Sequence, residues 1–262
     1  MGSADSGIRV VRKAGALLDV LAQRGPLSVA QLADATGEPR TTVYRLLASL
    51  RQLGWVTDGP RRGSYALDIG LLPLGRAAAG QSRTRACALP VMRALREETG
   101  LTVYLTVPRG TRAVCVERID GRTLQNFGLL LGGTLPLHAG AGPRVLLAFG
   151  DTELRGRWRR SVEQRGEARS LTALTPVSTR DIEDLLQKVV LNGYAVSTED
   201  NVPGLAAIGA PIFDADHGCL AALSISGRRD DLLHPDRRHA FVTAVVRSAQ
   251  RISERVGNKS IP

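Results

Sequence analysis

The segment Arg40 to Leu50 carries polar side chains in an arrangement that could bind DNA. Its apolar residues recur at helical spacing and form one stripe: Val43, Leu46, Leu47 and Leu50. Off that stripe, near the N-terminal end, lie side chains that can donate hydrogen bonds: Arg40, Thr41, Thr42, Tyr44 and Arg45. Base edges and phosphates accept such bonds, so we expect a helix that packs on one side and contacts nucleic acid on the other.

Two shorter patterns before this segment predict the helices that support it. Residues 10–21 have helical apolar spacing, and the Gly25-Pro26 pair ends the pattern. Ser28 and Gln31 can form a capping box at the start of a second helix that runs to about Thr36. We also include Ser28 among the candidate DNA-contact residues.

The connection between the second and third helices has the features of a tight turn. Gly37 fits a backbone position with positive φ, and Pro39 fits the first turn of the third helix. Ala33 and Val43 lie where a close helix crossing needs a small residue and an inward apolar one. The pattern favours a helix-turn-helix, whose second helix enters the major groove. An ordinary helical hairpin with an amphipathic second helix remains the alternative.

A predicted hairpin follows the third helix. Residues 54–58 and 64–68 are short strand-like runs on either side of the turn sequence GPRRG. This hairpin would be the wing of a winged helix, with Arg61 and Arg62 at its tip for phosphates or the minor groove. A solvated basic turn is the alternative.

Charge and cysteine usage bound the class of protein. The chain has 35 Lys and Arg against 25 Asp and Glu, a net charge of +10, which suits a polyanionic partner. The three cysteines, Cys87, Cys115 and Cys219, match no metal spacing and are expected to be reduced thiols. The sequence has neither a signal-peptide pattern nor a run of about 18 apolar residues, so we expect a cytoplasmic protein that does not contact a membrane.

The rest of the chain predicts an α+β domain. Strands are expected at 101–119, where two strands flank a Pro-Arg-Gly turn, and in three later runs within 194–227. Helices are expected at about 85–99, 144–150, 181–193 and 236–256, which gives an antiparallel sheet with flanking helices. We assign residues 8–70 to a DNA-binding domain, 71–85 to a helical linker and 86–258 to a ligand-binding domain.

The larger domain lacks the sequence signatures of catalysis. No Gly-rich phosphate loop and no HExxH or GxSxG motif occurs, and neighbouring Glu199 and Asp200 should point apart. Cys115, Cys219 and His138 are the loose candidates for a nucleophile and a base. We therefore expect a binding domain and not an enzyme, with no metal and no cofactor.

The strand CLAALSISG carries two hydroxyls in an unusual setting. Alternation places Ser224 and Ser226 on the same face as Leu220 and Ala222. Buried hydroxyls need hydrogen-bond partners, which a small polar ligand in a cavity could supply. Hydrogen bonds to neighbouring backbone would satisfy them equally well.

These features together resemble the IclR family of bacterial transcriptional regulators. The resemblance runs from about Val10 to Val256 and is strongest in the winged helix-turn-helix, in LPLHAGAGPRVLLA and in STEDNVPGLAAIGAPIFDADHGCLAALSISG. It implies a winged-helix domain, a helical linker and a GAF-like effector domain. It also implies a homodimer or a dimer of dimers on a palindromic double-stranded DNA operator, switched by a small organic or aromatic acid.

The resemblance also implies which residues line the effector pocket. They are Leu124, Leu135, Ala141, Gly142, Ser197, Ala207, Ser224 and Ser226. The family often has Gly-Lys where this chain has Pro143-Arg144, and an acidic residue where it has Ser197. Pro143 would fit the first position of a helix, and the two changes leave the effector class open.

The sequence therefore predicts a ligand-responsive, sequence-specific regulator, with repression as the commoner family mode. One alternative is a DNA-bound regulator that acts through protein partners, its pocket closed by Leu129, Leu130 and Leu131. The other is an enzyme built on the GAF-like domain.

Overall fold

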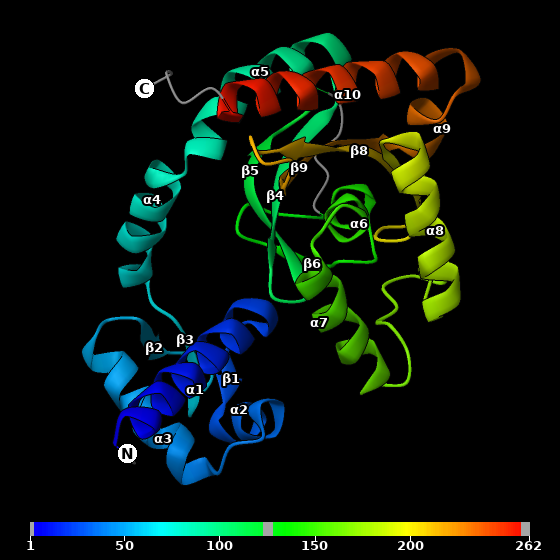
Figure 1. Cartoon of the computed structure of the whole chain (residues 1–262). Helices are drawn as coiled ribbons and strands as arrows, with labels where there is room; N and C mark the ends of the chain where they lie inside the picture. The colour runs from blue at the N-terminus through cyan, green and yellow to red at the C-terminus, as the bar shows by residue number, and fades with distance from the viewer. Residues whose placement is uncertain (1–2, 123–127, 258–262) are drawn as a thin grey trace. The chain divides into compact units, whose positions relative to one another are not determined.

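The computed structural model describes residues 3–122 and 128–257 and divides into two compact units between Gln81 and Ser82 (Figure 1). The division falls inside the segment 71–85, the predicted linker. Because the placement of one unit relative to the other is not determined, each is described by itself.

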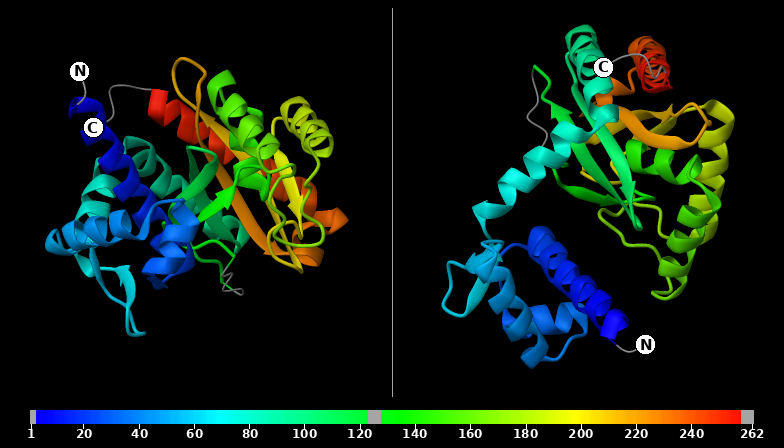
Figure 2. Two further views of the ribbon diagram at one scale, coloured as in Figure 1. Left: turned by 90° about the horizontal axis from the view of Figure 1, so that it is seen from below. Right: turned by 60° about the vertical axis from the view of Figure 1, so that its left-hand side comes forward.

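The described residues of the first unit form four α-helices, a short 3-10 helix and a small sheet. Its elements are α1 (Ser3–Arg24), β1 (Leu27–Ser28), α2 (Val29–Thr36), α3 (Arg40–Gln52), β2 (Val56–Asp58), β3 (Ser64–Leu67), the 3-10 helix η1 (Ile69–Leu71) and α4 (Leu72–Gln81). The sheet order is β1-β3-β2, with all pairs antiparallel. In both views of Figure 2 the β2–β3 hairpin projects away from α1, α2 and α3. The unit is a winged helix-turn-helix.

Local signals in the first unit fix the ends of α2. Ser28 Oγ accepts a hydrogen bond from the Gln31 amide at 3.3 Å, and Gln31 Oε1 accepts one from the Ser28 amide at 2.9 Å, so the predicted capping box is confirmed. Gly37 has a φ of 70° and donates to the Ala33 carbonyl at 2.9 Å, as the turn requires. Pro39 lies one residue before α3, not inside its first turn; its carbonyl accepts the Val43 amide at 3.0 Å.

A six-stranded antiparallel sheet organises the second unit. Its order is β6-β5-β4-β9-β8-β7. The strands are β4 (Thr102–Arg109), β5 (Arg112–Ile119), β6 (Thr134–Pro136), β7 (Ala195–Thr198), β8 (Leu205–Phe213) and β9 (Cys219–Arg228). The helices are α5 (Arg83–Thr99), α6 (Ala141–Ala148), α7 (Thr152–Glu163), α8 (Thr179–Asn192), α9 (Arg229–Leu232) and α10 (Pro235–Gly257). The predicted α+β class is confirmed, whereas the helix α7 is not predicted from the sequence.

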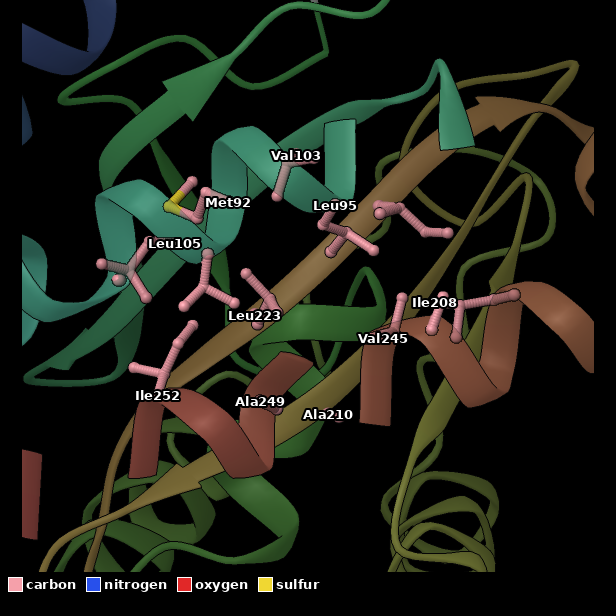
Figure 3. Packing of buried hydrophobic residues seen from close by; sticks show 14 of the residues in the cluster. Met92, Leu95, Val103, Leu105, Ile208, Ala210, Leu223, Val245, Ala249 and Ile252 are labelled. Atoms are coloured by element: carbon pink, nitrogen blue, oxygen red, sulfur yellow. The ribbon is translucent and has the colours of Figure 1, made fainter. Parts of the chain in front are cut away.

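Helices cover both faces of this sheet. α5 and α10 lie on one face, and α6 packs on the other beside α8 (Figure 1). Figure 3 shows the first core: Met92 and Leu95 of α5 and Val245 and Ile252 of α10 meet strand residues such as Leu223. A second core surrounds α6, all eight residues of which are buried. Successive side chains of β9 point to opposite faces of the sheet. Leu223 and Ile225 therefore pack in the first core, whereas Ala222 packs in the second.

Within the described residues, the longest helices are too polar to span a bilayer.

Candidate functional site

The exposed side of α3 carries the side chains predicted to contact DNA. Val43 and Leu47 are at most 1% exposed and anchor the helix in the core of the first unit. Arg40, Thr41 and Arg45 are exposed, and the Tyr44 side chain is 56% exposed although it is large and aromatic. Thr42 is half-buried at the edge of this face. The helix therefore presents donors to solvent while its opposite face holds it in place.

The hairpin beside α3 presents two further guanidinium groups. Ser64 is buried and ties the tip together: its Oγ donates to the Arg61 carbonyl at 2.6 Å and accepts from the Arg61 amide at 3.2 Å. Arg61 and Arg62 are exposed at that tip. Neither these two side chains nor Arg40 and Arg45 form an ion pair within the described parts of the chain, so all four charges are available to a polyanion.

Two acidic residues near this face are neutralised. Lys13 of α1 binds Glu38 at 2.7 Å, and Arg51 pairs with Asp58. Glu38 precedes α3 and would otherwise repel phosphate. Ser28 lies in the same unit, but its hydroxyl is engaged in the capping box. Sequence alone gave no sign of the Lys13–Glu38 pair, because the two residues lie 25 positions apart.

A cavity lies in the second unit between the start of α6 and the sheet. It has an empty volume of about 490 Å³, part of it open to solvent. Seven of the eight residues implied by the family resemblance line it: Leu135, Ala141, Gly142, Ser197, Ala207, Ser224 and Ser226. Leu124 lies outside the described residues. The structure thus brings one set of predicted residues to a single cavity.

The strand register places the polar residues of the cavity in rows. Ser197, Ala207 and Ser226 are direct cross-strand partners on β7, β8 and β9. Ser224 lies opposite Tyr104 of β4. Ser226 Oγ donates to the Ala206 carbonyl at 3.0 Å. The hydroxyl of Ser226 is therefore bonded to a neighbouring backbone group, which was the alternative to a bound ligand. The hydroxyls of Ser197 and Ser224 bond to no group in the described part of the protein, although both residues are 5% exposed.

Two glycines let the start of α6 approach the sheet closely. A Cβ on Gly209 would lie 3.0 Å from the Gly142 amide nitrogen, and one on Gly142 would lie 2.9 Å from Thr106 Oγ1. The first helical position is Ala141, so Pro143 is third and not first as expected. The missing N–H of Pro143 therefore removes no bond within the helix, because the first amides of a helix have no intrahelical acceptor.

A buried ion pair holds this helix start to the loop after β7. Arg144 and Asp200 are 4% and 2% exposed, and the Arg144 guanidinium pairs with Asp200 Oδ2. The guanidinium also donates to the Val196 carbonyl at 2.9 Å and the His138 carbonyl at 3.3 Å. Asp200 Oδ2 further accepts the Gly140 amide at 3.3 Å. The pair fixes the geometry of one cavity wall.

Several residues of the cavity are not predicted from the sequence, among them Tyr104, Thr106 and Asp200. Tyr104 and Thr106 could have been found, because residues two apart on one strand share a face. Asp200 had no such signal. Leu129 lines the cavity, whereas Leu130 and Leu131 are 56% and 62% exposed and do not close it.

The loose catalytic candidates are poorly suited to nucleophilic chemistry. Burial raises the pKa of Cys115 and that of Cys219 to about 12 each, so both remain thiols at neutral pH. Burial also lowers the pKa of His138. Among residues 3–122 and 128–257 no cluster of His, Cys, Asp and Glu could hold a metal ion.

Comparison with known proteins agrees with the fold. The family model of the IclR helix-turn-helix domain matches residues 10–60. The family model of the bacterial transcriptional regulator IclR C-terminal domain matches residues 77–254. HTH-type transcriptional regulator KipR of Bacillus subtilis is 31% identical over 252 residues, 95% of this chain and 97% of that protein. Transcriptional repressor IclR of Escherichia coli is 27% identical over 90% of this chain and 86% of its own length.

Solved structures show the same architecture. An IclR transcriptional regulator from Alicyclobacillus acidocaldarius is 25% identical, with a TM-score of 0.76 over 95% of this chain and 99% of that one. A regulator from Silicibacter sp. TM1040 shares the fold at 22% identity, with a TM-score of 0.80 over 97% and 98% of the two chains. The chain therefore belongs to the IclR family of bacterial transcriptional regulators, and it is a DNA-binding regulator and not an enzyme.

Proposed function

We propose that the protein binds a specific operator through α3 and responds to a small organic or aromatic acid bound in the cavity of its second unit. The main support for DNA binding is the exposed face of α3, which presents hydrogen-bond donors opposite a buried apolar stripe. Arg40, Thr41, Tyr44 and Arg45 contact base edges or adjoining phosphates, with Thr42 at the margin. Arg61 and Arg62 bind the backbone and supply affinity that falls with salt.

The outer face of α1 supports a homodimer on a palindromic site. Ile8 and Val11 are 58% and 72% exposed, and apolar or small residues continue at alternating three- and four-residue steps: Ile8, Val11, Gly15, Leu18 and Ala22. That spacing is the seam of two packed helices. A dimer would place two copies of α3 on successive half-sites, which is how helix-turn-helix proteins bind palindromes. Two such dimers could occupy a longer operator.

The cavity supports an effector role. It combines unbonded hydroxyls of Ser197 and Ser224 with apolar Leu135 and the amides at the start of α6. Helix N-termini bind carboxylates because their amides lack intrahelical acceptors and the helix dipole favours negative charge. Several relatives are named repressors, so we propose repression that the acid relieves, in the cytoplasm where the operator DNA lies.

The ligand-free alternative needs a cavity filled by the protein's own side chains. Leu130 and Leu131 are exposed instead of filling it, which favours the ligand.

Fluorescence anisotropy with the DNA upstream of the gene tests the proposal. We would titrate the full chain at two salt concentrations, with competitor DNA, and with and without a panel of organic and aromatic acids. Binding that survives competitor and weakens with one acid would support a ligand-gated repressor. Binding that depends strongly on salt but not on sequence would contradict specific recognition. Tight binding that no acid alters would favour the alternative that acts through protein partners.

A further inference from the structure

The loop between β7 and β8 forms one wall of the cavity. Asn201 and Val202 of this loop line the cavity and are half-buried, whereas Pro203 and Gly204 beside them are exposed. The loop tip, residues 201–203, therefore borders the cavity on one side and solvent on the other. Most of the other described lining residues lie on strands or on α6, whose backbone groups are bonded within the sheet or the helix.

Few hydrogen bonds hold the loop tip itself. Asn201 and Val202 donate no hydrogen bond to another described residue, and Pro203 has no amide hydrogen to donate. The Val202 carbonyl accepts the Leu205 amide at 3.2 Å. A segment with so few bonds opens at little cost in free energy, so the position of the tip depends on what holds its two ends.

The two ends of the tip are held differently. At one end, Asp200 is fixed by its buried pair with Arg144. At the other end, Glu199 Oε1 accepts the Gly204 amide at 2.7 Å, Glu199 Oε2 pairs with Arg229 at 3.0 Å, and the Arg229 amide donates to the Gly204 carbonyl at 2.9 Å. We call these three residues the clamp.

The clamp is the weaker of the two ends. The Arg229 side chain is 49% exposed, and an exposed ion pair contributes little to stability. Glu199 has a φ of 53°, a left-handed conformation that is unfavourable for a residue with a Cβ. The contacts of its carboxylate therefore hold a strained turn, which is released when they break.

We propose that the loop tip is the gate through which an effector enters the cavity, and that the clamp keeps this gate closed. The inference rests on the proposed effector role of the cavity. Gly204 has a φ of 76° and can serve as the hinge, because glycine changes conformation at low cost. Opening there would expose the Ser224 hydroxyl while the buried pair of Arg144 and Asp200 stays intact.

The labelling rate of a thiol inside the cavity tests the gate. Ser224 lines the cavity and is 5% exposed, so Ser224→Cys places a thiol behind the loop tip. The full chain is treated with iodoacetamide, and mass spectrometry of its peptides gives the rate at each cysteine. That rate follows the population of the open state. Ser197→Cys offers a second position in the same cavity.

Loosening the clamp should speed the labelling of the introduced thiol. Glu199→Ala removes both contacts of the carboxylate and should raise the rate at least about fivefold. Glu199→Gln keeps an acceptor for the Gly204 amide but loses the ion pair, so we expect a rise of about two- to threefold. Glu199 is not among the described lining residues, so neither change alters the cavity surface.

Three controls make the result specific. Arg229→Gln should match Glu199→Gln, because it breaks the same ion pair; the two changes shift the local charge in opposite directions, so agreement excludes an effect of charge on the thiol. Arg228→Gln changes an exposed neighbour that forms no ion pair with a described residue and should leave the rate unchanged. Cys115 is 0% exposed and does not line the cavity, so its labelling should stay the same in every variant.

An unchanged rate at the introduced thiol in Glu199→Ala would overturn the gate, since the reagent would then enter elsewhere. A parallel rise at Cys115 would overturn it as well, because the whole unit would be loosened. If Glu199→Ala does not fold, Glu199→Gln and Arg229→Gln still decide. The labelling is done without an acid, so failure of the gate appears in these rates, whereas failure of the proposed effector role appears in the anisotropy panel.

Discussion

At the scale of single residues, the neighbouring carboxylates of Glu199 and Asp200 lie in different surroundings, one at the surface and one in the interior. As expected for adjacent side chains, they point apart. Glu199 binds the exposed Arg229 at 3.0 Å, whereas Asp200 turns inward to Arg144. The first pair is a surface ion pair of small energetic value. The second is buried, so removing one partner would leave an uncompensated charge at a cost of about 3–5 kcal/mol.

Arg45→Ala tests whether this side chain reads bases. We expect affinity for the operator to fall by about 1–3 kcal/mol while affinity for random DNA changes little, since a base contact is lost. Arg62→Ala is the comparison: it should weaken both DNAs equally and lower the salt slope by about one. Anisotropy titrations at several salt concentrations measure both effects. Equal losses on both DNAs for Arg45→Ala would make it a phosphate contact.

His138 should make the second unit less stable in mild acid. Burial, the largest cause, lowers its pKa in the folded state, and nearby Arg144 and Arg165 lower it further while Asp200 and the bonded Arg169 carbonyl raise it. The unfolded chain therefore binds more protons below pH about 6.5, and stability falls as the pH drops, by at most about 1.4 kcal/mol per pH unit from this group. Thermal unfolding between pH 7.5 and 5.5 measures the fall. His138→Gln should reduce its steepness; an unchanged slope would assign the effect to other groups.

At the scale of elements, much could be predicted because local chemistry marks helix ends. The capping box at Ser28 and the glycine at position 37 bound α2, and Ser178, which accepts the Asp181 amide at 3.1 Å, starts α8. α7 was not predicted because its apolar pattern is weak. Only Leu154, Trp158 and Val162 are buried, and several arginines lie between them. Its packing partner α6 is known only from the tertiary structure.

Gly37→Ala tests the turn of the helix-turn-helix. No atom lies within 4 Å of the added Cβ, so the change acts only through the positive φ of 70°, and we expect a loss of about 1–2 kcal/mol in the free energy of unfolding. Gly75→Ala in α4 also meets no atom within 4 Å, but it has helical geometry and should stabilise by about 0.5–1 kcal/mol. Denaturant unfolding compares the two. Equal effects would mean that the turn tolerates another conformation.

At the scale of the whole molecule, function depends on coupling two units that each have their own core. The first unit buries its apolar residues around α3, and the second buries its own on both faces of the sheet. An effector in the second unit can change DNA affinity only if it favours one arrangement of paired units over another. The dimer is therefore part of the proposed mechanism.

Val11→Glu tests the dimer seam on α1. We expect a charge in an apolar interface to shift the protein towards the monomer in light-scattering measurements and to reduce operator affinity at least about tenfold, while each monomer remains folded. Gln23→Glu adds the same charge outside the seam and should leave both quantities unchanged. A Val11→Glu protein that stays dimeric would place the interface elsewhere.

The sequence by itself determined the helix-turn-helix, the hairpin with Arg61 and Arg62, and the face of β9 that carries Ser224 and Ser226. These follow from helical and strand periodicity and from turn residues, which act over a few positions. The tertiary structure decided what those faces meet. Gly209 allows α6 to approach the sheet, Asp200 reaches Arg144 across 56 positions, and Tyr104 joins the same cavity. Such contacts depend on packing between distant segments, which no local pattern encodes.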